Sequence, residues 1–183
     1  MTDATPPDAA LRAALNEIRE RGAIGTTDID AAISHAEQFA SVLPGDVRIL
    51  ADLGSGGGLP GLVIAVRRPE LSITLVERRR SRADLLERAV RKLDLTDRVV
   101  VYADDVRLLA GTHAAAFDAV TARSFGAPAV TMQWGSTLLR PGGILVVSEP
   151  PTDDPRRWPD ALLDEWSMHD QGRHQGVRVF CHL

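Results

Sequence analysis

The segment Ile49–Gly61 constrains the fold more than any other part of this 183-residue chain. It reads Ile-Leu-Ala-Asp-Leu-Gly-Ser-Gly-Gly-Gly-Leu-Pro-Gly, so a short apolar run leads directly into a glycine-rich turn. The apolar run is typical of a buried strand, and the proline suits the first turn of a helix. A second apolar run closes on an acidic residue, Glu77. Together these features predict an α/β sheet that holds an adenosine-bearing cofactor.

Apolar periodicity alternates between strands and helices along the rest of the chain. We expect strands at 47–53, 71–77, 98–102, 117–122, 143–148 and 177–181, and helices at 59–67, 79–93, 105–110, 127–139 and 160–166. This alternation implies a doubly wound, mostly parallel sheet with right-handed crossovers. Residues 139–143 predict a turn before the fifth strand, and residues 150–159, with four prolines, predict a loop after it.

Two amphipathic helices are expected ahead of the first strand. One covers residues 8–21, and the other starts at a cap formed by Thr27 or Asp28 and stops before Pro44. We interpret residues 1–45 as a helical cap or lid segment. Residues 46–183 form the cofactor-binding domain, and the two parts make a single structural unit.

Composition narrows the class of protein. Apolar residues make up 44% of the chain and charged residues 25%, as in an ordinary globular protein. The net charge of −4 argues against a nucleic-acid coat protein but allows a local basic face. No membrane span or signal peptide is expected, and the single cysteine favours a reducing, cytoplasmic setting. The five histidines show no metal-ligand spacing, so we expect no metal site.

The glycine turn fits two cofactor patterns. Gly56–Gly61 matches G-x-G-x-x-G, and Glu77 follows 21 residues after Gly56, which is the nicotinamide or flavin fingerprint. Counted from Asp52, glycines instead occupy every second position at 54, 56 and 58. This second pattern is similar to the first motif of class I S-adenosylmethionine (SAM) methyltransferases. We favour it, because a dinucleotide site has little use for Asp52; a purely structural turn is the remaining alternative.

The class I resemblance implies a Rossmann-like fold with a seven-stranded sheet and SAM as cofactor. It places Asp52 near the ammonium group of the methionine part and Glu77 on both ribose hydroxyls. The turn residues Gly54, Ser55, Gly56 and Gly58 would line the cofactor.

The same resemblance assigns the adenine end of the cofactor to the residues after the third strand. Asp104 or Asp105 would contact the adenine amine there. The alternative for either carboxylate is that it serves only as the cap of the next helix. Arg140–Gly143, before the fifth strand, is also usual in this class.

The turn ends in Leu-Pro-Gly, and Asp52–Gly61 thereby resembles the bacterial GidB/RsmG family, which methylates a guanine N7 in small-subunit ribosomal RNA. Phe117–Arg123 is similar to that family's fourth-strand segment, which ends in an arginine on the substrate side. Ser34–Glu37 and Gly172–His174 are also similar, so the resemblance covers about residues 30–182. It implies a SAM-dependent methyltransferase with structured ribosomal RNA as its partner.

Two features depart from that family. The N-terminal region is shorter, and Ser148-Glu149-Pro150 follows the fifth strand where the family has a lysine and a glycine. A carboxylate at the substrate-side rim would repel RNA phosphates. A small-molecule acceptor, or a SAM-binding module without catalysis, therefore stays open.

Arg123 is the candidate catalytic residue. Guanine N7 has a free lone pair, so methyl transfer requires positioning rather than a general base. Arg123 would hold a phosphate or the guanine O6, and the alternative is an ion pair with Asp118 or Glu149. The arginines of segment 78–82 are interpreted mainly as a solvated helix face, some of which could serve a ligand.

Overall fold

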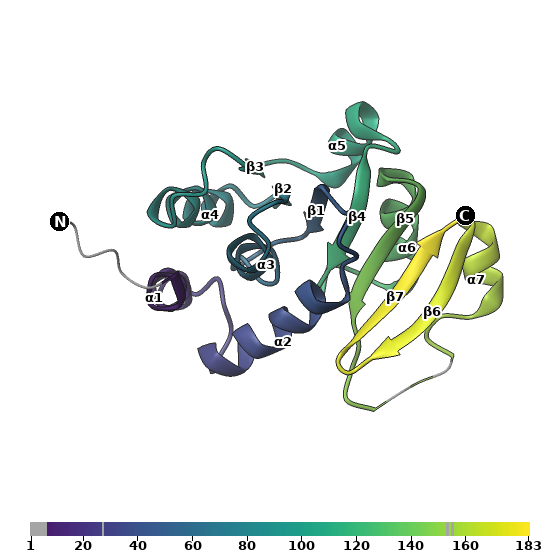
Figure 1. Ribbon diagram of the computed structural model, residues 1–183, viewed down its shortest axis with the longest axis horizontal. Helices are drawn as coiled ribbons and strands as arrows, with labels where there is room; N and C mark the ends of the chain where they lie inside the picture. The colour runs from purple at the N-terminus through teal and green to yellow at the C-terminus, as the bar shows by residue number, and fades with distance from the viewer. Residues whose placement is uncertain (1–6, 27, 153, 155) are drawn as a thin grey trace.

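The computed structural model describes residues 7–26, 28–152, 154 and 156–183, and it contains one seven-stranded sheet between two layers of helices (Figure 1). The strands are β1 Ile49–Leu53, β2 Ser72–Val76, β3 Val99–Tyr102, β4 Phe117–Ala122, β5 Leu139–Ser148, β6 Met168–His174 and β7 Val177–His182. The helices are α1 Pro7–Glu20, α2 Ile29–Val42, α3 Gly61–Arg67, α4 Arg80–Lys92, α5 Val106–His113, α6 Pro128–Leu138 and α7 Asp160–Glu165.

The strand order is β3-β2-β1-β4-β5-β7-β6. Strands β1 to β5 pair in parallel, and β7 is antiparallel to both β5 and β6. This arrangement confirms the predicted doubly wound, mostly parallel sheet of seven strands. Between β1 and β4 the order of the strands reverses, and a crevice opens there at the carboxyl ends of the strands.

The N-terminal helices belong to the main hydrophobic core. Helices α1 to α4 cover one face of the sheet, and α5 to α7 cover the other (Figure 1). Leu15 of α1 and Phe39 of α2 are fully buried, in one cluster with Leu50 of β1. The described part of segment 1–45 therefore packs onto the sheet, and its action as a lid stays a prediction. None of the helices in the described ranges is long and apolar enough to cross a membrane.

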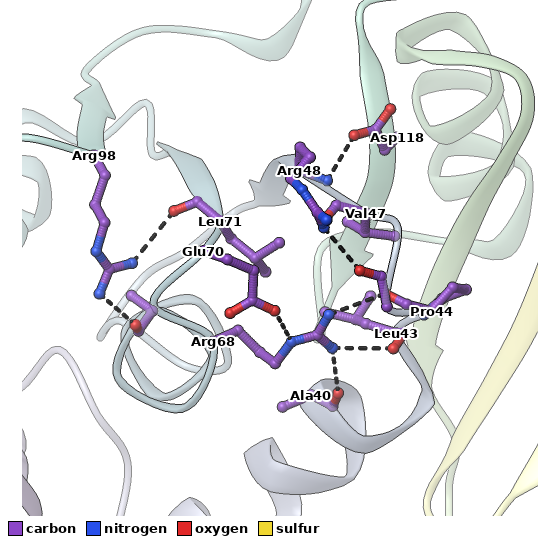
Figure 2. A network of polar contacts seen from close by, with 12 residues as sticks. Ala40, Leu43, Pro44, Val47, Arg48, Arg68, Glu70, Leu71, Arg98 and Asp118 are labelled. Carbon is purple, nitrogen blue, oxygen red and sulfur yellow. Dashed lines mark hydrogen bonds and ion pairs between the residues drawn. The ribbon is translucent and has the colours of Figure 1, made fainter.

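A polar network near the amino ends of strands β1, β2 and β4 connects α2 to the residue that follows α3 (Figure 2). The Arg68 guanidinium donates to the carbonyl oxygens of Ala40, Leu43 and Pro44 at 3.3, 3.0 and 2.9 Å. These carbonyls lie at or just beyond the end of α2, where the last carbonyls of a helix have no partner within it. Arg68 therefore holds the end of α2 near the amino ends of the strands. The carboxyl ends of the strands, where the crevice opens, lie away from this network.

Two elements differ from the sequence prediction. Strand β6 was not predicted, because it is an edge strand of mostly polar residues with a bulge between Asp170 and Gly172. Strand β5 begins at Leu139 rather than at Gly143, since the predicted turn is a bulge inside the strand, between the pairs Phe117–Leu139 and Ala119–Ile144. Asp28 caps α2 through the N–H groups of Asp30 and Ala31; Thr27 lies outside the described residues.

Candidate functional site

Three adjoining cavities lie where the strand order reverses. The Glu77 cavity, about 330 Å³, is lined by residues that follow β1, β2, β3 and β4 and by part of α6. The Gly56 cavity, about 220 Å³, lies between the glycine turn and residues 23–25. The Glu149 cavity, about 350 Å³, lies between His35 of α2 and the residues after β4 and β5. Ser124 lines all three, so they adjoin one another, and together they are called the cleft.

The glycine turn is locked to the end of β2. The Ser55 N–H donates to the Val76 carbonyl at 3.0 Å, and the Ser55 hydroxyl donates to the Asp52 carbonyl at 2.8 Å. The Gly56 N–H donates to Glu77 Oε2 at 3.0 Å, with Gly56 at a φ of +53° that disfavours other residues. The turn and the carboxylate are therefore placed as one rigid unit.

Glu77 is buried, with 5% of its surface exposed, yet its carboxylate keeps acceptor capacity. Oε2 accepts from Gly56, and Oε1 accepts from the Arg79 N–H at 2.8 Å. Each carboxylate oxygen can accept a further hydrogen bond. A pair of adjacent hydroxyl groups entering the Glu77 cavity would meet these lone pairs, as the ribose prediction requires.

The other glycines of the turn differ in what they contact. A Cβ on Gly57 would lie 2.2 Å from Ile24 Cγ1 and 2.9 Å from the Ala23 carbonyl, so the segment between α1 and α2 rests on the bare turn. A Cβ on Gly58 would lie 2.4 Å from Leu62 Cδ1, and Gly58 lines none of the three cavities. Gly54 lines two of them beneath the Phe125 ring. The structure thus places Gly54, Gly56 and Gly57, but not Gly58, against the cleft.

The two aspartates after β3 divide their roles. The Asp105 side chain accepts from the Arg107 N–H at 3.0 Å as the cap of α5, and it also pairs with the Arg107 guanidinium. This hydrogen bonding from Arg107 holds the pKa of Asp105 below its ordinary value. Asp104 is exposed, accepts only the Asp105 N–H among the described residues, and lines the Glu77 cavity. Asp104 is therefore the better candidate for the adenine amine.

Asp52 lies beneath the turn rather than at its surface. Its carboxyl is fully buried; Oδ1 accepts from the Thr121 hydroxyl at 2.7 Å, and Oδ2 has no hydrogen-bond partner among the described residues. Burial raises the pKa of Asp52 to about 6, although the Thr121 hydrogen bond and the Arg123 charge oppose the rise. Asp52 lines none of the three cavities, so the structure does not place its side chain in direct contact with them.

Arg123, at the end of β4, lines both the Gly56 and the Glu149 cavities. Among the described residues, Arg123 forms no ion pair with Asp118 or Glu149: Asp118 pairs with Arg140, and Glu149 lies at ion-pair distance from Arg157 and Arg178. Burial lowers the pKa of Arg123, against the opposing charge of Asp52. Burial and the Arg123 charge also lower the pKa of His35, so the imidazole is neutral beside this cation at neutral pH.

Sequence reasoning missed several lining residues. Ser124 and Phe125 directly follow Arg123, and this position at a strand end is the signal that could have identified them. Trp134 lines the Glu77 cavity and Trp158 lines the Glu149 cavity. Of the arginines in segment 78–82, Arg80 pairs with Asp84 at the surface, whereas positions 78, 79 and 82 line the Glu77 cavity. The described residues contain no cluster of three or more potential metal ligands.

Comparison with known proteins relates this chain to a family of methyltransferases. The family model described as GidB, rRNA small subunit methyltransferase G, matches residues 14–150. The ribosomal RNA small subunit methyltransferase G of Sorangium cellulosum (strain So ce56) is 42% identical over 99 residues, which are 54% of this chain and 41% of that protein. The chain spans about half the length of the curated relatives it matches.

Solved structures share the fold at low identity. An O-methyltransferase from Bacillus cereus in complex with SAH has a TM-score of 0.63 and 14% identity, covering 98% of this chain and 93% of that one. The [4+2]-cyclase SpnF has a TM-score of 0.66 and 24% identity, covering 89% of this chain and 70% of that one. Their names differ in chemistry, so this likeness shows the class I methyltransferase fold and no particular reaction. Because the family model spans most of the sequence, the chain belongs to the GidB family, rRNA small subunit methyltransferase G.

Proposed function

We propose that the chain is a SAM-dependent methyltransferase that methylates guanine N7 in small-subunit ribosomal RNA. The observation that carries the proposal is the position of the Glu77 carboxylate. Its Oε2 accepts a hydrogen bond from the Gly56 N–H at 3.0 Å, and Glu77 lines a cavity beside the glycine turn. Family membership supports the same cofactor and acceptor.

The residues of the cleft fit SAM along its length. The adenosine part would occupy the Glu77 cavity, with Glu77 accepting from the ribose hydroxyls and Asp104 from the adenine amine. The methionine part would occupy the Gly56 cavity. The buried Asp52 carboxylate lies below the turn, and its negative charge favours a cationic ligand above it.

The acceptor would enter the Glu149 cavity, which meets the Gly56 cavity at Arg123 and Ser124. SAM, when bound, supplies a methyl group on a sulfonium for in-line displacement by the N7 lone pair. The base loses no proton in this reaction, which fits a cleft that needs no general base. Arg123 would orient the guanine through O6 or a neighbouring phosphate. The complete alignment of acceptor and SAM, to which this contact contributes one part, can supply on the order of 7–11 kcal/mol of barrier reduction.

A small-molecule acceptor is the second candidate. A cavity of about 350 Å³ falls within the range of small-ligand pockets, and the net charge of −4 does not attract RNA at long range. Salt separates the two candidates, because RNA binding weakens steeply as salt rises while binding of an uncharged metabolite does not.

The test is methyl transfer from labelled SAM to three acceptors in parallel: small ribosomal subunits lacking N7-methylguanine, the naked RNA, and an RNA-free metabolite extract. We expect label in the RNA, mapped to guanine N7 by mass spectrometry, and loss of transfer in Glu77→Ala. Label only in the metabolite fraction would support the second candidate. Binding of SAM without label in any fraction would indicate a module without catalysis.

A further inference from the structure

Glu149 does not face the acceptor with an open negative charge. Its side chain is only 1% exposed, and Oε1 accepts from the Trp158 indole N–H at 2.6 Å. Arg178 of β7 lies 3.7 Å from Oε1, and Arg157 lies 3.8 Å from Oε2. The carboxylate is thus enclosed by an indole and two guanidinium groups. The sequence expectation that Glu149 repels RNA phosphates at the rim is therefore corrected by the position of its side chain.

Arg157 is the group that this arrangement presents to the cleft. Its side chain is 29% exposed, lines the Glu149 cavity, and lies with its Cζ 5.3 Å from the centre of the Trp158 ring. The separation of 3.8 Å from Glu149 is an ion-pair distance, too long for a hydrogen bond. Arg157 is therefore held in place by charge and by the indole face, while its N–H donors stay available for a ligand.

A second cation lines the same cavity as Arg157. Arg123 lines the same cavity from the end of β4, and the neighbouring His35 is neutral because its pKa is lowered. Among the described residues that line this cavity, the guanidinium groups are those of Arg123 and Arg157, and the carboxylate is that of the enclosed Glu149. The mouth of the cavity therefore presents guanidinium groups to a ligand, in a chain whose net charge is −4. Guanidinium groups bind phosphate oxygens through paired N–H donors.

We propose that Arg157 binds a backbone phosphate of the RNA next to the target guanine, and that Glu149 is a positioning residue that holds Arg157 at the rim. This inference rests on the proposed function, because it assumes an RNA acceptor. It adds a residue from the far side of the cleft to the role already given to Arg123. Glu149 touches the acceptor only through Arg157.

The experiment measures RNA affinity of the SAH-loaded full-length chain across a salt series, together with KM and kcat for RNA methylation. The key variant is Arg157→Ala, and Arg156→Ala is the matched control, since Arg156 is 89% exposed and pairs only with Asp154 among the described residues. We expect R157A to weaken RNA binding and raise KM roughly tenfold and to reduce the slope of log K against log salt by about 1. R156A should change neither quantity appreciably, and SAM affinity should be the same in both.

A double-mutant cycle tests the positioning role. Glu149→Gln keeps an acceptor for Trp158 but removes the charge that holds Arg157. We expect E149Q to weaken RNA binding in the wild-type background and to have little further effect in the R157A background. If E149Q weakens RNA binding equally in the wild-type and R157A backgrounds, or if E149Q does not fold, Glu149 is removed from the proposal. The assignment of Arg157 would then rest on the R157A result alone.

The outcomes separate this inference from the proposed function. If the wild type methylates RNA and R157A matches R156A in KM and salt slope, the Arg157 inference is overturned while the function stands. If the wild type neither binds nor methylates RNA but binds SAM, the RNA function fails, and this inference fails with it.

Discussion

Burial of the Asp52 carboxyl beneath the glycine turn carries an electrostatic cost that depends on pH. Burial raises its pKa from an ordinary value of 3.8 to about 6, so the folded chain holds a proton that the unfolded chain releases near pH 4. The stabilising contribution of this group is therefore fully present below pH 4. It is lost as pH rises through 6, and the total loss is about 3 kcal/mol.

The variant Asp52→Asn isolates this contribution. The free energy of unfolding of the wild type, measured relative to D52N by urea denaturation, should fall by about 3 kcal/mol between pH 4 and pH 7. A difference that stays constant across this range would show that Asp52 titrates normally. Because SAM is cationic, its binding should lower the pKa of Asp52, and proton release on binding near pH 6 would report that coupling.

Arg123 is predicted to act on the acceptor rather than on the cofactor. Arg123→Ala should lower kcat for methyl transfer about a hundredfold, since loss of one orienting contact misplaces the acceptor. The affinity for SAM, measured by calorimetry, should change by less than about threefold. Arg123 also lines the Gly56 cavity, so a large loss of SAM affinity in R123A would move its role to the methionine part of the cofactor.

Residue patterns in the sequence predicted the groups that are fixed by local geometry and missed those brought in by tertiary contacts. Glu77 was predictable because it ends a strand next to the glycine turn. The enclosure of Glu149 was not, since Trp158 and Arg178 reach it from a proline-rich loop and an antiparallel strand. The sequence left both aspartates open as helix caps; only the hydrogen bonds identify Asp105 as the cap.

At the level of elements, the glycine turn joins the N-terminal helices to the cofactor site. Gly57 is covered by Ile24 and Ala23, and these three residues all line the Gly56 cavity. The connection between α1 and α2 therefore forms part of the wall of this cavity, and a change in the contact alters the cleft directly.

Gly57→Ala should destabilise the chain by roughly 1–3 kcal/mol, because the added methyl has no room. It should also weaken SAM binding by displacing residues 23–25. Gly45→Ala is the matched control, since a Cβ there meets nothing within 4 Å and Gly45 lines none of the three cavities. Thermal unfolding and SAM titration of both variants check the prediction, and identical behaviour of G57A and G45A would contradict it.

The elements themselves followed from periodicity wherever one face is buried. Helix α4 and strands β1 and β4 were predicted almost to their ends because their apolar residues repeat at the period of the element. Strand β6 has only Met168 buried and pairs with β7 alone, so no apolar pattern marks it. The bulge of β5 was interpreted as a turn because Pro141-Gly142-Gly143 is a sequence typical of turns. In the structure Gly142 has a φ of +77°, a conformation that glycine adopts in bulges as well as in turns.

At the scale of the whole molecule, the N-terminal helices and the sheet share one core, and they should unfold together. Phe39 of α2 is fully buried, and all three tryptophans lie beyond residue 130. Phe39→Ala should lower the free energy of unfolding by about 3–5 kcal/mol. The shift should be equal by tryptophan fluorescence and by far-ultraviolet circular dichroism. A variant that loses helical signal while its tryptophan transition stays unchanged would show an independently folded lid.

The central claim is that the cleft binds SAM through the glycine turn and Glu77. Calorimetric titration of the purified chain with SAM, SAH and NAD, side by side, tests it most directly. We expect one site for SAM and SAH, no heat with NAD, and at least a tenfold loss of SAM affinity in Glu77→Ala, because the ribose hydroxyls would lose a charged acceptor. Binding of NAD in preference to both S-adenosyl compounds would contradict the account.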